Sequence, residues 1–298
     1  MSPSPILDLI ARRPVLFDGA IGTELMKRGL PQGHCPELWN VENPAVVRDI
    51  HRSYFEAGSD AVVTNTFGGS RLKLESYGLA ARCAELNGAA AALALSVRPE
   101  GGFVGGDIGP TGKFLMPQGE YTEAEFETSF AVQARALAAA GVDFIMIQTM
   151  FDLREALCAV RAARSVAGGV PTFATMTFNR TRRGFFTLMG DSVAKCVAAF
   201  EALDVPAFGA NCTLTGSDLA DVIREMRSLT PRPLIAQPNA GQPGLNRAEK
   251  VVYSQGIEEF AADVPKMRAA GANVIGGCCG TDPDYIRRAA AILRAGRL

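Results

Sequence analysis

The stretch Gly276-Gly277-Cys278-Cys279-Gly280-Thr281, near the end of the chain, places two adjacent cysteines between glycines. It follows the apolar run Ala272-Asn273-Val274-Ile275, which is typical of a buried strand. Successive side chains of a strand point to opposite faces, so two neighbouring thiols reach one point only where the strand ends and bends. Glycine permits such a bend. A third cysteine closes another apolar run, in Gly209-Ala210-Asn211-Cys212.

Three of the seven cysteines are therefore predicted to hold one zinc ion: Cys212, Cys278 and Cys279. Three thiolates would leave the fourth tetrahedral position for a substrate, which is the pattern of catalytic rather than structural zinc. A redox disulfide between the adjacent pair is the alternative, but it would be strained and the chain has no Cys-x-x-Cys spacing. The other cysteines are expected to be small buried residues of helices or, for the first, incidental in a loop: Cys83, Cys158, Cys196 and Cys35.

The composition excludes several classes of protein. The 298 residues include 30 basic and 31 acidic side chains, a net charge of −1, so nothing favours nucleic acid or an anionic membrane as a partner. No apolar run approaches the roughly 18–20 residues that cross a bilayer, and the first residues do not resemble a signal peptide. An odd number of cysteines with two adjacent thiols suits a reducing compartment, so we expect a cytoplasmic protein.

Eight apolar runs, each followed by a helical pattern, indicate the fold. The expected strands are 14–17, 61–63, 102–105, 144–147, 172–178, 207–211, 234–236 and 272–275. Strict alternation of strands and helices implies a parallel sheet, and eight units in about 290 residues predict a closed (β/α)8 TIM barrel. A doubly wound open sheet is the alternative. We expect one barrel unit over residues 1–298, with residues 1–13 as an N-terminal extension.

The helices carry recognisable end signals. Asn43 is the expected cap of the helix that ends at Gly58, and Thr122 with Glu125 forms a capping box. Pro265 should kink or split the helix near 257–270. The long connections 28–43 and 241–256 are expected to lie above the strand ends as lids or rims.

Active sites of such barrels lie at the carboxyl ends of the strands. Polar residues gather at these positions: Asp18, Asn65, Asp107, Gln148, Asn211 and Asn239, together with the three cysteines. The glycine-flanked segment 18–23 offers backbone N–H groups that could bind a carboxylate, although a plain structural turn explains it equally well. With only His34 and His51 available, a histidine-based catalytic or metal site is not expected.

Seven segments, in order between about residues 14 and 290, resemble the homocysteine S-methyltransferase family, which includes the homocysteine-binding domain of cobalamin-dependent methionine synthase and the betaine–homocysteine methyltransferases. They are Asp18-Gly-Ala-Ile-Gly-Thr-Glu24, Pro36-Glu-Leu-Trp-Asn40, Thr64-Asn-Thr-Phe-Gly68, Gly106-Asp-Ile-Gly-Pro-Thr-Gly112, Asn211-Cys212, Pro238-Asn-Ala-Gly241 and Gly276-Gly-Cys-Cys-Gly-Thr281. The resemblance implies a zinc-bearing barrel in which the three cysteines are the ligands. It also implies a substrate site built from Asp18, Gly19, Ala20, Ile21, Gly22, Thr23, Glu24, Asn65, Gln148, Asn211 and Asn239.

One position departs from the family pattern. Where the family usually has Glu-Thr after strand four, this chain has Gln148-Thr149. The glutamate is expected to pair with the ammonium of homocysteine, and a neutral amide supplies no charge. Either binding is weaker, another acid such as Glu24 or Asp107 compensates, or the thiol is not homocysteine.

The resemblance implies a zinc-dependent thiol S-methyltransferase that converts homocysteine to methionine. Zinc deprotonates a bound thiol, and its sulfur then displaces a methyl group from an onium or cobalt centre. Since the sequence ends soon after the eighth unit, we expect no cobalamin or folate module, and the donor is either methylcobalamin on a separate protein or a small onium. The alternatives are a methyltransferase subunit of a multi-protein corrinoid system acting on another thiol, and a non-catalytic zinc- or thiol-binding barrel.

Overall fold

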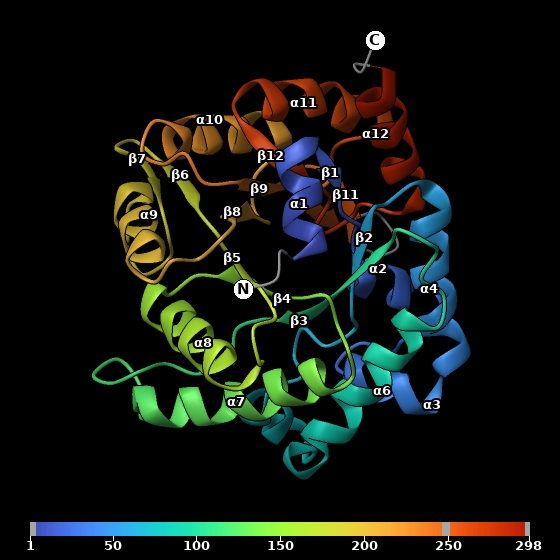
Figure 1. Ribbon diagram of the computed structural model, residues 1–298, viewed down its shortest axis with the longest axis vertical. Helices are drawn as coiled ribbons and strands as arrows, with labels where there is room; N and C mark the ends of the chain where they lie inside the picture. Colours follow the sequence, from blue (N-terminus) through green and yellow to red (C-terminus); the bar gives the residue numbers. More distant parts are fainter. Residues whose placement is uncertain (1–3, 246–250, 296–298) are drawn as a thin grey trace.

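Eight parallel strands form a closed barrel in the computed structural model, which describes residues 4–245 and 251–295. The strands are β1 (Val15–Leu16), β2 (Ala61–Val63), β3 (Phe103–Ile108), β4 (Phe144–Met150), β5 (Thr172–Met176), β8 (Phe208–Asn211), β9 (Leu234–Gln237) and β12 (Ala272–Ile275). Hydrogen bonds join them in the order β1-β12-β9-β8-β5-β4-β3-β2. A parallel bridge between Phe17 and Ala61 brings β1 back to β2 and closes the ring. The predicted TIM barrel is confirmed (Figure 1).

Helices surround this barrel. They are α1 (Pro5–Arg12), α2 (Ile21–Lys27), α3 (Trp39–Glu42), α4 (Pro44–Ala57), α5 (Arg71–Leu74), α6 (Cys83–Leu95), α7 (Glu123–Ala139), α8 (Leu153–Val166), α9 (Val193–Ala202), α10 (Gly216–Arg227), α11 (Ile257–Ala269) and α12 (Pro283–Ala295). None of the described helices has both the length and the apolar character needed to span a bilayer.

The helix-end predictions have mixed outcomes. The capping box of Thr122 and Glu125 is present at the start of α7. Asn43 occupies the predicted cap position before Pro44, but its side chain makes no capping hydrogen bond to α4. The expected split at Pro265 is also absent, since α11 runs through it as one helix.

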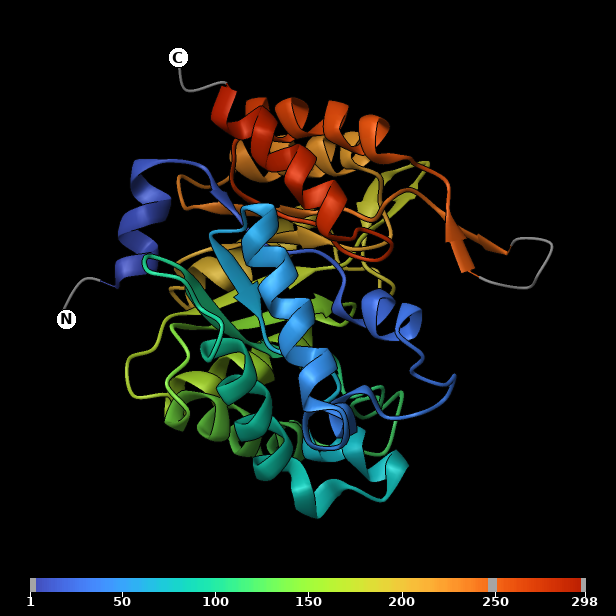
Figure 2. The same ribbon diagram turned by 90° about the vertical axis from the view of Figure 1, so that its right-hand side faces the viewer.

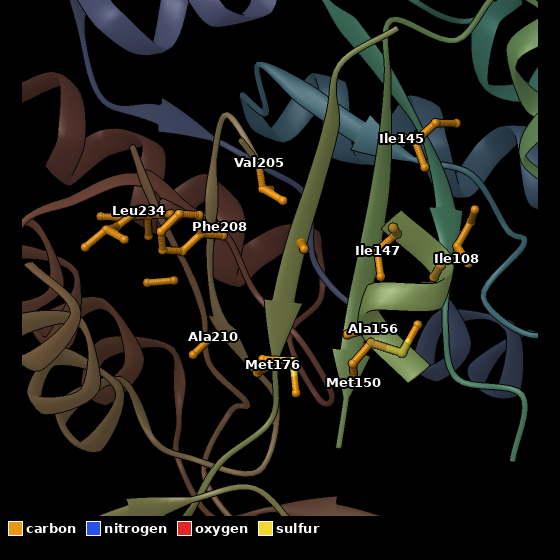
Figure 3. Close-up of a cluster of buried hydrophobic side chains, with 14 of the residues drawn as sticks. Ile108, Ile145, Ile147, Met150, Ala156, Met176, Val205, Phe208, Ala210 and Leu234 are labelled. Atoms are coloured by element: carbon orange, nitrogen blue, oxygen red, sulfur yellow. The ribbon is translucent and has the colours of Figure 1, made fainter. Parts of the chain in front are cut away.

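Alternating side chains of the strands build two apolar layers. In β4, Ile145 and Ile147 point outward to the helices, where they join the large cluster shown in Figure 3. Phe144 and Met146 point into the barrel, where Phe144 stacks on Phe173 with ring centroids 5.0 Å apart. This alternation gives each strand one face for the barrel interior and one for the helices.

The two ends of the barrel are covered differently. Helix α1 lies at one end, where Ile6 and Ile10 join the apolar interior. The hairpin of β10 (Pro243–Leu245) and β11 (Val251–Tyr253) projects from the opposite end, as Figure 2 shows. The connection predicted to lie above the strand ends thus contains a β-hairpin, although residues 246–250 of it lie outside the described part of the chain.

Several element boundaries differ from the sequence prediction. Strand β3 runs on to Ile108 and β4 runs on to Met150, so Asp107, Gln148 and Thr149 lie within strands rather than after them. Gln148 and Thr149 fall where the register between β4 and β5 shifts. A second hairpin, β6 (Asn179–Thr181) with β7 (Gly184–Phe186), follows β5 in the connection for which no strand was predicted. Short hairpins outside the barrel carry no long apolar run, so periodicity does not reveal them.

Candidate active site

The three predicted ligands come together at the carboxyl end of the barrel. Cys212 follows β8, and the pair Cys278–Cys279 follows β12, with β9 between the two strands. The Sγ atoms of Cys212 and Cys279 are 3.9 Å apart, and all three sulfurs lie within 4.8 Å of one another. All three cysteines are free.

This arrangement fits a zinc ion. A tetrahedral centre with Zn–S bonds of about 2.3 Å places its sulfurs roughly 3.8 Å apart, close to the observed separation of Cys212 and Cys279. Hydrogen bonds from Cys212 and Cys278 lower the pKa of the Cys279 thiol, so the trio gives up a first proton readily. Thiolates are the soft ligands that zinc prefers in proteins.

One other close group of possible ligands occurs in the described residues, but it does not fit a metal. Glu123, Glu127 and Cys158 cluster between α7 and α8. The Arg161 guanidinium donates to all three, with N···O distances of 2.9 and 2.6 Å and an N···S distance of 3.3 Å. A cation already occupies the position that a metal would need.

Asn211 fixes the backbone around the first cysteine. Its side-chain oxygen accepts from the Thr149 N–H at 2.9 Å and from the Thr175 hydroxyl at 2.8 Å, and its Nδ2 donates to the Thr149 hydroxyl. Cys212 and Thr149 both adopt positive φ, at 63° and 60°, a conformation that costs free energy for residues other than glycine. Asn211 therefore stabilises a strained connection between the ends of β4 and β8.

Two glycines of the cysteine stretch are required for different reasons. A Cβ at Gly277 would lie 2.2 Å from the Thr281 hydroxyl, so close packing excludes a side chain there. Gly280 has φ +84°, and a Cβ on it would lie 2.3 Å from the ring of Tyr253. The predicted bend after the cysteines therefore depends on Gly280, whereas Gly277 permits close packing.

A cavity of about 270 Å³ opens beside the sulfurs. The predicted residues that line it are Asp18, Gly19, Ala20, Ile21, Gly22, Thr23, Asn65, Gln148, Cys212, Cys278 and Cys279. Helix α2 already begins at Ile21, so only the first part of the segment 18–23 is a loop. The Gly277 N–H donates to the Asp18 carbonyl, and the Ala20 N–H donates to the Thr281 carbonyl. These bonds hold the first strand end against the cysteine stretch.

Three predicted substrate residues do not line the cavity: Glu24, Asn211 and Asn239. Glu24 lies within 3.0 Å of the Lys27 ammonium and also pairs with Arg28, so its charge is already neutralised. Asn211 is buried among the strand ends, as described above. Asn239 is buried beside the same strand ends, and its Oδ1 has no hydrogen-bond partner among the described residues.

The cavity wall is acidic. Asp18 is 1 % exposed, and burial raises its pKa to about 8, although its Oδ2 accepts from the Val63 N–H. Burial also raises the pKa of Asp107 well above its usual range, and the nearby Asp18 and Glu37 carboxylates raise it further. Burial raises the pKa of Glu37 as well. Burial in the cavity wall therefore disfavours these negative charges.

Several lining residues were not among the predicted site residues. Asp107 was placed at this end of the barrel by the strand-end rule and named as a possible compensating acid, and it does line the cavity. Thr149 and Gln237 also stand at strand ends, so the same rule could have included them. Tyr253 and Glu37 come from the long connections, where no periodic signal marks them. Tyr253 lines the cavity together with Cys279, and its ring packs against Gly280, which brings the β10–β11 hairpin beside the predicted metal ligands.

Comparison with known proteins agrees with this geometry. The methionine synthases of Mycobacterium tuberculosis and Mycobacterium leprae are 34% and 33% identical over 96% of this chain. The chain spans about a quarter of the length of these curated relatives, since it covers 25% of each. The metallated homocysteine methyltransferase MmuM from Escherichia coli superposes with a TM-score of 0.80 at 25% identity, covering 97% of this chain and 99% of that one. Residues 15–293 match the homocysteine S-methyltransferase family model, and the chain belongs to this family of methyltransferases.

Proposed function

We propose that this chain is a zinc-dependent thiol S-methyltransferase that methylates homocysteine to methionine, with the methyl donor bound or delivered separately. The observation that carries the proposal is the meeting of three cysteine sulfurs at the edge of an acidic cavity. Cys212, Cys278 and Cys279 would hold the metal, and the open tetrahedral position would face the cavity.

Zinc, when bound there, supplies the Lewis acidity that removes the proton of a thiol at neutral pH. The cavity residues then have to hold the substrate. A bond forms between the substrate sulfur and the donor methyl carbon, the bond from that carbon to the donor breaks, and its electron pair leaves with the donor. The wall of the cavity contributes by fixing the amino acid so that sulfur and methyl carbon lie in line.

The donor and partner belong to the same proposal. The relatives named methionine synthase are about four times longer than this chain, which supports delivery of the methyl group from outside the barrel described here. Methylcobalamin on a corrinoid protein and a small onium compound are the two donors considered. No nucleic acid or membrane enters the proposed reaction. Residues 1–298 are proposed to act as one barrel unit, with residues 1–13 as an extension of it.

A second candidate follows from Gln148, which supplies an amide where the family's usual pattern has a carboxylate. This residue favours, as the runner-up, a methyltransferase subunit of a corrinoid system that acts on a thiol other than homocysteine. A crossed screen of several thiols against methylcobalamin, a methylated corrinoid protein and onium donors separates the two. Transfer to homocysteine supports the first candidate, and transfer only to another thiol supports the second.

The test of metal dependence uses one cysteine in the site and one outside it. We expect Cys279→Ala, like removal of zinc by a chelator, to abolish methyl transfer, because the substrate thiol would remain protonated. Readdition of zinc should restore the wild type but not the variant. Cys158→Ala, a buried position on α8, is the matched control and should retain activity and zinc. Full activity after stoichiometric zinc removal would refute the proposal, and a non-catalytic zinc-binding barrel would retain zinc and methylate no thiol.

A further inference from the structure

The Asp107 side chain lines the cavity, and one of its carboxylate oxygens accepts no hydrogen bond from the described residues. We propose that Asp107 receives the ammonium group of the thiol substrate, that Asp18 flanks the same group, and that Gln148 is the positioning residue that orients Asp107. This inference rests on the proposed function, because it takes the substrate to be a thiol that carries an amino group.

The first step of the argument is the state of the Asp107 side chain. Asp107 lines the cavity and is 3 % exposed. Its Oδ2 accepts from the Gln148 Nε2 at 2.8 Å, whereas its buried Oδ1 has no hydrogen-bond partner among the described residues. The backbone is fixed on both sides, since the Asp107 N–H donates to the Thr64 hydroxyl oxygen and its carbonyl accepts from the Thr66 hydroxyl. The free oxygen is therefore held in place rather than left to rotate away.

The second step is the charge around that oxygen. None of the described residues lining the cavity is a lysine, arginine or histidine. Asp18 also has one buried oxygen, Oδ1, that has no hydrogen-bond partner in the part of the chain that the structure describes. The third lining carboxylate, Glu37, is satisfied, because it accepts from the Gly68 N–H at 2.6 Å and from the Cys35 thiol at 3.2 Å. Two unsatisfied carboxylates in a buried wall are costly unless a cation pairs with them.

The third step distinguishes between cations. A buried acceptor oxygen requires a hydrogen-bond donor, and leaving it without one costs free energy. An ammonium group carries three N–H donors, enough for Asp18 Oδ1 and Asp107 Oδ1 together. A sulfonium or quaternary ammonium donor has no N–H and would leave both oxygens unsatisfied. The cavity wall thus fits the amino group of the thiol better than the onium group of a methyl donor.

The fourth step assigns the role of Gln148. Because its Nε2 donates to Asp107, its Oε1 is turned toward the Asn211 Nδ2, 3.5 Å away. Asn211 is itself held by Thr149 and Thr175. A glutamate at position 148 would instead place a second carboxylate against Asp107, and two such groups cannot both stay ionised. The amide therefore lets Asp107 carry the charge.

The test compares two thiols on the zinc-loaded full chain without a methyl donor. L-Homocysteine and 4-mercaptobutanoate share the thiol and the carboxylate, and only the first has an ammonium group. Titration calorimetry measures both affinities for the wild type, Asp107→Asn, Gln148→Glu and the double variant. Asp49→Asn, an exposed aspartate on α4, is the control for loss of one negative charge. Zinc content and thermal unfolding are measured on each protein.

In Asp107→Asn the amide oxygen can still accept from Gln148, and the NH2 group then faces the cavity. We expect homocysteine to bind at least about tenfold more weakly, the ratio that about 1.4 kcal/mol produces, and 4-mercaptobutanoate to bind within about twofold of the wild type. The double variant Asp107→Asn with Gln148→Glu moves the carboxylate to the neighbouring strand and should recover part of the lost homocysteine affinity.

Two results would overturn the inference. One is a homocysteine affinity that does not change in Asp107→Asn, and the other is an equal loss for both thiols, which indicates a structural role. Failure of the proposed function would look different. If the proposed function is wrong, the zinc-loaded wild type binds neither thiol, or Cys279→Ala still methylates homocysteine. A wild type that methylates homocysteine while Asp107→Asn binds it unchanged contradicts only the inference.

Discussion

The two ends of the barrel are built on opposite principles. At the amino ends of the strands, α1 covers an interior of apolar side chains, among them Ile6, Ile10, Val15, Phe144 and Phe173. At the carboxyl ends, three of the lining residues have buried oxygens without partners: Asp18, Asp107 and Gln237. The apolar side chains at the amino end stabilise the barrel. The unpaired buried oxygens at the carboxyl end lower its stability but remain available to bind a ligand.

The difference shows where substitutions should affect folding and where they should affect binding. Burial of large apolar side chains is the main favourable contribution to folding. A buried oxygen without a hydrogen-bond partner lowers the free energy of unfolding. Variants of the amino end should therefore unfold more easily with the site intact, and variants of the carboxyl end should lose binding with little or no loss of stability.

The largest expected effect on stability is at Phe144, which stacks on Phe173 and also packs against Phe17. Phe144→Ala should lower the free energy of unfolding by about 3–5 kcal/mol, because it leaves a cavity in the barrel interior. Chemical denaturation measures this change. Zinc content and thiol affinity of the folded fraction should remain near the wild-type values. A Phe144→Ala protein with the wild-type free energy of unfolding but without thiol binding would contradict the proposed division between the two ends.

His51 is an exception to the comparison, because it is a buried polar group that does not line the cavity. It lies on α4, fully buried, with neither ring nitrogen bonded among the described residues. Burial lowers its pKa to about 4, so the folded state keeps it neutral while the unfolded chain takes up a proton below pH 6.5. Stability should therefore fall by up to about 3 kcal/mol as pH drops from 6.5 to 4.

Denaturation at several pH values checks this expectation, with His51→Gln and His34→Gln as the matched pair. The first variant should flatten the pH dependence between 6.5 and 4, whereas His34 is exposed and its variant should follow the wild type. Identical pH profiles for wild type and His51→Gln would show that this histidine is charged or solvated in the folded protein.

An effect of opposite sign is expected at Asp18. Its pKa is raised to about 8 from an ordinary value of 3.8, so the folded state holds a proton that the unfolded chain releases. Stability of the zinc-free protein should therefore decrease as pH rises from about 4 to about 8. Asp18→Asn should remove this dependence and be more stable than the wild type at pH 7.5, because a neutral amide has no charge to bury. A loss of stability in this variant would mean that the carboxylate is needed for folding.

The sequence predicted those features that short residue patterns specify, such as strands and strand ends, and not those that depend on contacts between distant residues. The alternation of apolar runs located all eight strands, and β2 and β12 have the predicted bounds. The strand-end rule placed Asp18, Asn65 and Gln148 in the cavity wall. It failed for Asn211, because the side chain turned inward to hold Thr149 and Thr175. A strand-end position determines which end of the barrel a residue occupies, but not which neighbour it bonds.

The sequence by itself determined the barrel, the end of it that carries the chemistry and the three cysteines, because strand periodicity and glycine-bounded cysteines are properties of short segments. Only the tertiary structure decided that Glu24 pairs with Lys27 and Arg28, that Tyr253 packs against Gly280, and that Gln148 bonds Asp107. Except for the Glu24 pairs, these contacts join residues from separate units of the barrel. Their existence depends on closure of the ring and on which way each side chain turns, and no local pattern in the chain specifies either.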